Sequence, residues 1–88
     1  MKAIRRSTQF KKDYKRLKKS GNNLAELQRV INQLATDESL EPKYCDHALF
    51  GKYSGCRECH IEPDWLLIYK NSVTEFSLVR TGSHSELF

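Results

Sequence analysis

The nearly continuous apolar run WLLIYK at residues 65–70 is the feature that most constrains the fold of this chain. A run of this length between two turns predicts a buried central strand. Pro63-Asp64 before it and Asn71-Ser72 after it are residue pairs typical of tight turns. The segments beyond these turns, 57–62 and 74–80, alternate in polarity and predict two flanking strands. We therefore expect an antiparallel meander.

Two amphipathic helices are predicted before the strands. Ser7 or Thr8 can cap the first helix, and Ser20-Gly21 ends it. Asn23 resembles the first residue of a capping box for the second helix, which ends near Asp37. The apolar stripes comprise Phe10, Tyr14 and Leu17 in the first helix and Leu24, Leu27, Ile31 and Leu34 in the second. The fold class is therefore α+β, with an antiparallel helical hairpin on one face of a small, mainly antiparallel twisted sheet.

The rest of the chain gives weaker indications. Residues 1–6 are a candidate short strand, 38–55 are expected to be irregular, and the tail TGSHSELF begins with turn residues. With 88 residues the chain is expected to form one domain, 1–88. It has no apolar run long enough for a membrane span and no apolar segment after its basic start, so we expect a cytoplasmic protein without membrane contact, whose three cysteines stay reduced.

The positive charge is concentrated in the first 20 residues. They carry nine Lys or Arg against one acid, Asp13, which gives +8, while the other 68 residues sum to −4. Such a segment favours a polyanion or an acidic partner, although a solvated helix face is the alternative for any one side chain. The candidate RNA-binding side chains in this helix are Lys11, Lys12, Lys15 and Arg16.

The stretch CRECHIEPDW at residues 56–65 admits three interpretations. Its first five residues fit C-x-x-C-H, the spacing of a c-type haem attachment site, but that chemistry needs export, for which we find no signal. Zinc needs four converging ligands, whereas Cys56 and Cys59 would point to opposite faces of a strand. We interpret the cysteines as small, partly buried apolar residues. The third interpretation is a nucleic-acid cleft.

The residue types needed to cut RNA are all present. One group must take the proton of the 2′-hydroxyl, another must protonate the departing 5′-oxygen, and imidazole suits both because its reference pKa of about 6.5 lies near working pH. Guanidinium groups can bind the phosphate bidentately, and an exposed indole can stack on an unpaired base. The candidates are His47, His60, Asp64 and His84 for proton transfer, Arg57 and Arg80 for the phosphate, and Trp65 for stacking.

Three motifs then resemble one known family. D-H-A-L-x-G, R-E-C-H-I-E-P-D-W-L-L-I-Y-K and R-T-G-S-H-S-E-L-F are similar, in this order, to the YafQ branch of the RelE/ParE superfamily, the toxins of type II toxin–antitoxin modules. The resemblance covers the whole chain. It implies a RelE-like fold and a ribosome-dependent mRNA endonuclease that works without metal or cofactor.

The resemblance also implies site residues and partners. The family's functional positions correspond to His47, His60, Asp64, Trp65, His84 and Phe88, and Arg57 and Arg80 look like phosphate-contacting positions. The implied partners are mRNA, the ribosome with its RNA, and a cognate antitoxin that wraps the toxin. Operator DNA is expected to be bound only through the antitoxin complex.

The roles are hypotheses at this point. We expect His84 to be the general acid and Asp64, with His60 across the same turn, to act as the base or to orient it. Trp65 and Phe88 have simpler alternatives, as a hairpin core residue and a C-terminal anchor. Two other functions stay open, a ParE-like gyrase poison and an inactive module that only binds an antitoxin. All of this requires three imidazoles that lie far apart in the sequence to meet in one pocket.

Overall fold

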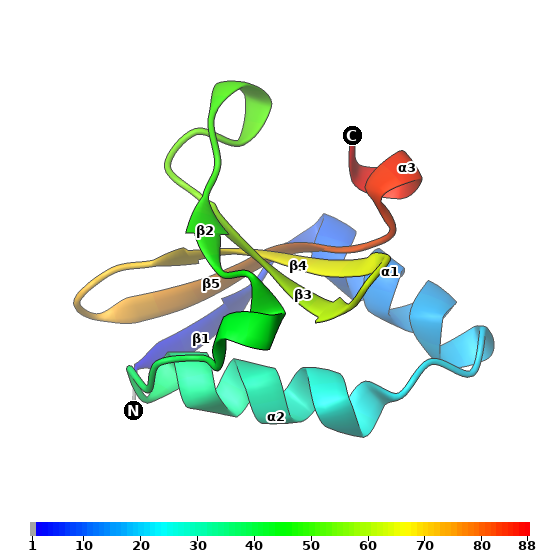
Figure 1. Ribbon diagram of the computed structural model, residues 1–88, viewed down its shortest axis with the longest axis horizontal. Helices are drawn as coiled ribbons and strands as arrows, with labels where there is room; N and C mark the ends of the chain where they lie inside the picture. Colours follow the sequence, from blue (N-terminus) through cyan, green and yellow to red (C-terminus); the bar gives the residue numbers. More distant parts are fainter. Residues whose placement is uncertain (1) are drawn as a thin grey trace.

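The computed structural model describes residues 2–88 as a twisted five-stranded sheet with helices on both faces (Figure 1). The elements are β1 (Ala3–Arg6), α1 (Thr8–Lys19), α2 (Leu24–Ala35), η1 (Pro42–Tyr44), β2 (His47–Ala48), η2 (Gly51–Tyr53), β3 (Arg57–Glu62), β4 (Trp65–Asn71), β5 (Glu75–Gly82) and α3 (His84–Leu87). The predicted α+β class, the meander and the helical hairpin are confirmed. Of the candidate strand at 1–6, Met1 lies outside the described residues.

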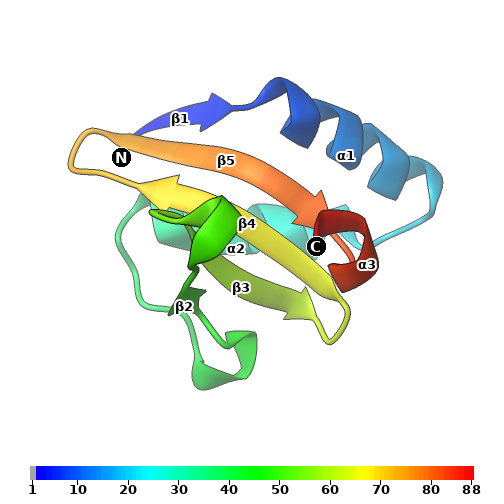
Figure 2. The same ribbon diagram turned by 90° about the horizontal axis from the view of Figure 1, so that it is seen from above.

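The strand order is β1-β5-β4-β3-β2, as Figure 2 shows from above. β1 runs parallel to β5, and all other neighbours are antiparallel. β4 has neighbours on both sides and five buried residues in a row, so the prediction of a central strand is correct. Four short elements were not predicted, because they are too short to show a periodicity. They are β2, with two residues, the 3₁₀ helices η1 and η2, with three each, and α3, with four.

A β-bulge in β5 changes which face its side chains occupy. Tyr69 of β4 lies opposite Leu78, but the preceding Ile68 lies opposite Arg80, so Val79 is an extra residue in the ladder. Directly opposite residues of an antiparallel pair share a face. Leu78 therefore faces the same side as Tyr69, while Arg80 faces the side of Ile68.

Side-chain caps fix the starts of the two long helices. The Ser7 hydroxyl accepts a hydrogen bond from the Phe10 backbone N–H at 2.9 Å, and the Asn23 side chain accepts one from the Glu26 N–H at 3.2 Å. Gly21, with φ of 76°, follows the first helix as predicted. No helix within residues 2–88 is long and apolar enough to cross a membrane.

Each face of the sheet has its own hydrophobic cluster. The larger one joins the hairpin to the sheet through Phe10, Leu17, Leu27, Val30, Ile31, Leu34, Cys59, Ile61, Trp65, Leu67, Tyr69, Phe76 and Leu78, with Ala35 and Tyr44. The smaller one, under α3, contains Tyr53, Leu66, Ile68 and Leu87. We call these the helix-covered face and the α3 face. Phe76 and Leu78 of the larger cluster are fully buried.

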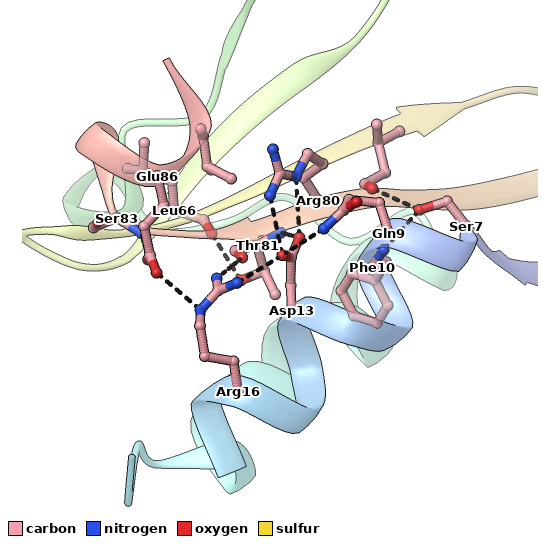
Figure 3. Close-up of polar contacts among 12 residues, drawn as sticks. Ser7, Gln9, Phe10, Asp13, Arg16, Leu66, Arg80, Thr81, Ser83 and Glu86 are labelled. Atoms are coloured by element: carbon pink, nitrogen blue, oxygen red, sulfur yellow. Dashed lines mark hydrogen bonds and ion pairs between the residues drawn. The ribbon is translucent and has the colours of Figure 1, made fainter. Parts of the chain in front are cut away.

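Side chains of α1 complete the edge of β5 where β1 ends (Figure 3). The Asp13 carboxylate is fully buried and accepts a hydrogen bond from the Thr81 backbone N–H at 3.3 Å. Arg16 donates to the Thr81 carbonyl at 3.3 Å, and the Ser7 hydroxyl donates to the Val79 carbonyl at 2.7 Å. These groups take the place of a neighbouring strand, because buried backbone N–H and C=O groups need partners.

Asp13 also binds two guanidinium groups. Arg80 donates through Nε and Nη2 at 3.1 Å each, and Arg16 donates through Nη1 at 3.0 Å. Burial alone would raise the pKa of Asp13, but the hydrogen bonds from Arg80, the Thr81 N–H, Gln9 and Arg16 outweigh it. The pKa of this carboxyl therefore lies below its usual value of 3.8.

The low pKa of Asp13 predicts a loss of stability in acid. A carboxylate whose pKa is lower in the folded state stabilises the fold above its unfolded-state pKa and loses this effect as the pH falls through the folded-state pKa. We expect the free energy of unfolding, measured by urea denaturation, to decline as the pH drops below about 4. Asp13→Asn should remove this part of the decline and cost on the order of 3 kcal/mol at pH 7.

Asp37→Asn is the control for that measurement. Its carboxylate pairs with Lys2 at 2.7 Å and is 64% exposed, so its loss should cost much less stability than the loss of the buried Asp13. Equal acid dependence of the wild type and Asp13→Asn would contradict the interpretation.

Candidate active site

The three imidazoles of the chain lie in a row on the α3 face. His47 comes from β2, His60 from β3 and His84 from the first position of α3. The ring centroids of His47 and His60 are 6.4 Å apart, and those of His60 and His84 are 5.9 Å apart. The three rings, which come from distant parts of the sequence, therefore meet on one surface.

Sheet register explains why they meet. His47 lies opposite Glu58, Glu58 opposite Ile68, and Ile68 opposite Arg80, so these four side chains form a row across the sheet. His60 lies opposite Leu66, whose side chain belongs to the cluster under α3. Because β4 lies between β3 and β5, the Cα atoms of Glu58 and Arg80 are two strand spacings, or roughly 10 Å, apart.

Glu58 is the residue of this site that sequence analysis missed. Its side chain is only 4% exposed, and Oε1 lies 3.2 Å from His60 Nε2 and 3.5 Å from His47 Nε2. Because a carboxylate only accepts hydrogen bonds, this contact holds the His60 proton on Nε2 and leaves Nδ1 free. The alternation of β3, which puts Glu58 and His60 on the same face, was the one indication in the sequence.

His47 is oriented at its other nitrogen. Nδ1 lies 2.6 Å from the Cys45 carbonyl oxygen, to which it donates. The His47 side chain is half exposed, whereas that of His60 is mostly covered. The central imidazole of the row is thus the most enclosed of the three.

Asp64 contacts His84 and not His60. Its Oδ1 accepts a hydrogen bond from the His84 backbone N–H at 3.3 Å and lies 3.8 Å from His84 Nδ1. The expectation that Asp64 and His60 meet across the turn is therefore wrong in this structure: Glu58 is the partner of His60. The site contains two carboxylate–imidazole pairs, Glu58–His60 and Asp64–His84.

The helix α3 is anchored by Leu87. That side chain is buried, and the Tyr53 hydroxyl donates to the Leu87 carbonyl at 3.0 Å. The Phe88 ring lies 5.7 Å from the His84 ring and 5.4 Å from the Tyr53 ring, yet Phe88 remains 59% exposed. Since Leu87 anchors the tail, Phe88 presents its ring to solvent beside His84.

Two residues predicted for RNA contact do not join this surface. Trp65 is buried among the residues of the helix-covered face, and its Nε1 donates to Thr81 Oγ1 at 2.9 Å. The prediction that it stacks on a base is wrong for this conformation, and the core alternative holds. Arg57 alternates with Glu58 and so faces the other side, where it pairs with Asp46 at 3.2 Å.

Arg80 does lie on the α3 face, but two of its nitrogens are taken by Asp13. In Figure 3 the third nitrogen of its guanidinium points away from Asp13. The expected bidentate phosphate contact is therefore reduced to the donors that Asp13 leaves free. The hydrogen bonds from Arg80 to Asp13 also keep the pKa of Arg80 above its usual value.

The basic residues of α1 divide into two sets. Lys11, Lys12 and Lys15 are exposed, whereas Arg16 is half-buried between Asp13 and Glu86. A groove of about 460 Å³ runs between α1 and α2, with an apolar floor and a basic rim. Its lining consists of Arg6, Phe10, Lys11, Tyr14, Lys15, Gln28 and Ile31.

The C-x-x-C-H residues do not converge on one point. Cys59 is buried in the larger cluster, on the opposite face from His60, and burial raises the pKa of its thiol to about 12. Within residues 2–88, no group of three His, Cys, Asp or Glu side chains is arranged to hold a metal ion.

Known proteins are similar to this chain in sequence and fold. The YafQ toxin family, bacterial toxins of type II toxin–antitoxin systems, matches residues 2–88. The chain is 37% identical to the mRNA interferase toxin YafQ of Escherichia coli K12 over 97% of this chain and 94% of that protein. A metal-bound toxin from Helicobacter pylori is 48% identical with a TM-score of 0.93 over 100% of both chains. The E. coli DinJ–YafQ toxin–antitoxin complex matches at 36% identity and a TM-score of 0.92, over 99% of this chain and 97% of that chain.

The Glu58–His60 contact predicts a single tautomer for His60. In a two-bond ¹H–¹⁵N spectrum at neutral pH, wild-type His60 should carry its proton on Nε2, and Glu58→Ala should give a mixture of tautomers because the acceptor is lost. Glu62→Ala, an exposed acid on the same strand, is the control and should leave His60 unchanged. The same His60 pattern in all three proteins would contradict the assigned contact.

Proposed function

The chain belongs to the YafQ family of bacterial type II toxins, and from this premise we propose that it is an mRNA interferase that cleaves messages on the ribosome. The observation that supports the proposal most is the row of imidazoles with two carboxylates behind it. These groups can move protons at one phosphodiester without help from another chain.

The proposed reaction is attack by the 2′-hydroxyl. His60, held by Glu58 with its Nδ1 free, takes the proton of the 2′-hydroxyl as the 2′-oxygen bonds to phosphorus. His84, oriented by Asp64, gives a proton to the 5′-oxygen as the bond from phosphorus to that oxygen breaks. The products are a 2′,3′-cyclic phosphate and a 5′-hydroxyl.

Three further side chains contribute to binding. The free donors of Arg80 stabilise the charge on the phosphate, since Arg80 shares a face with Glu58. His47 contacts the same carboxylate as His60 and positions the phosphate. Phe88, with its exposed ring, replaces Trp65 as the side chain that stacks on a base next to the cleaved bond.

The surface of α1 serves the larger partners. Lys11, Lys12 and Lys15 provide salt-sensitive, sequence-independent affinity for ribosomal RNA. The E. coli relative has been solved with its antitoxin, and we propose that an acidic segment of a cognate antitoxin covers the same basic rim. Operator DNA is then bound by the complex through the antitoxin. Action on translated messages places the toxin in the cytoplasm.

Cleavage mapping on a translated message tests the function. Wild type should give cuts in phase with codons, and His84→Ala should abolish them because the leaving oxygen lacks its acid. Ser85→Ala, an exposed change in the same helix, is the control and should cut like wild type. Binding to the antitoxin should be unchanged in both variants. DNA damage without RNA cuts would favour a ParE-like gyrase poison, and neither effect an inactive antitoxin-binding module.

The role of α1 has its own test. Lys11→Gln with Lys15→Gln should weaken ribosome binding and lower the slope of log affinity against log salt by about one unit per lost phosphate contact. The matched control is Lys43→Gln with Lys70→Gln, which removes the same charge from other exposed positions and should keep the slope. Equal slopes in the two double variants would show that α1 does not contact the ribosome.

A further inference from the structure

Asp13 is linked to both ends of the candidate active site. It is the only acid in the basic N-terminal segment and is fully buried, yet none of the proposed chemical steps uses it. Its first link is to Arg80, whose Nε and Nη2 both donate to the carboxylate. A guanidinium held at two nitrogens has a fixed plane, so the donors that remain free have a fixed direction.

The second link runs through Arg16 to α3. Arg16 donates to Asp13 from Nη1 at 3.0 Å, and its Nε lies 2.8 Å from Glu86 Oε2. Glu86 Oε1 in turn accepts a hydrogen bond from the Ser83 N–H at 2.8 Å and so closes the capping box of the helix that begins with His84. Figure 3 shows this chain of contacts from α1 to α3.

The backbone between the two links fits closely around Arg16 and Glu86. Gly82 has a φ of 155°, and a Cβ at this position would lie 2.9 Å from Arg16 Nη2 and 2.9 Å from Glu86 Oε1. Any side chain at residue 82 would therefore displace this ion pair. The backbone from Arg80 to His84 is therefore held at both ends. Arg80 binds Asp13 directly, and the start of α3 is connected to Asp13 through Glu86 and Arg16.

We propose that Asp13 is a positioning residue of the proposed nuclease: one carboxylate sets the direction of the Arg80 guanidinium toward the phosphate and, through Arg16 and Glu86, the position of the helix that carries His84. This inference rests on the proposed function. Asp13 would then both position catalytic groups and close the edge of β5.

A purely structural role makes a different prediction. If Asp13 only holds the fold together, its loss lowers activity independently of Arg80, and the two effects multiply. If Asp13 acts in part through Arg80, its loss lowers the rate less once Arg80 is gone, because the effects of interacting residues are not additive. A double-mutant cycle on the cleavage rate separates the two cases.

The test measures single-turnover cleavage at saturating programmed ribosomes, where affinity no longer limits the rate. We expect Asp13→Asn to lower this rate about 100-fold, the cost of a misplacement on the order of 1 Å. In the Arg80→Ala background the same change should lower it clearly less than 100-fold, because only the link through Arg16 and Glu86 is then left to lose. Asp37→Asn, which removes an exposed carboxylate paired with Lys2, should keep the wild-type rate.

If Asp13→Asn fails to fold, a second variant, Arg80→Lys, tests the same proposal. Lysine keeps the charge but lacks the planar fork that Asp13 holds, so its rate should fall nearly as far as that of Arg80→Ala. A wild-type rate for Arg80→Lys would overturn the proposal, and so would multiplying effects in the cycle. An active wild type with either result refutes only the role of Asp13, whereas an inactive wild type refutes the proposed function and this inference with it.

Discussion

The Asp13 carboxylate closes the edge of β5 just where β1 ends, and the placement of α1, β5 and α3 depends on it. An open N–H at Thr81 would be buried without a partner, at a cost of about 1–3 kcal/mol. In most sheets the backbone of a further strand would bind this N–H. Here α1 lies beside β5, and its side chains bind the backbone of Thr81. Because Asp13 and Arg16 both bind at Thr81, α1 has one position along β5, and Arg16 connects that position to α3.

The two faces of the sheet carry different kinds of residue: one holds the larger core, and the other holds the residues of the candidate active site. The helix-covered face holds the larger core, including Trp65, and gives the sheet its rigidity. The α3 face has a small apolar cluster and is otherwise occupied by imidazoles, Glu58 and Arg80. Neighbouring strands lie close enough for His47 and His60 to reach one carboxylate, so two residues of β2 suffice to bring the first imidazole to the site.

The sequence predicted the elements that repeat a pattern and missed those that depend on a partner. Both long helices and the three-stranded meander follow from periodicity. Glu58 was overlooked because its task appears only when β2 lies beside β3. Trp65 and Arg57 were assigned by residue type, but the alternation of their strands turns both toward the helix-covered face. Asp64 was paired with its neighbour along the chain, whereas α3, too short to predict, brings His84 to it.

The extra residue Val79 gives the sheet a change of phase. Up to Leu78, even-numbered side chains of β5 face the helices, and strict alternation would send Arg80 the same way. After the bulge the parity is reversed, so Thr81 faces Trp65 and Arg80 faces the opposite side. One inserted residue thus decides which face of the sheet carries the Arg80 guanidinium. A homologue without it could keep all five strands, but the side chains at the end of β5 would then lie on the opposite faces.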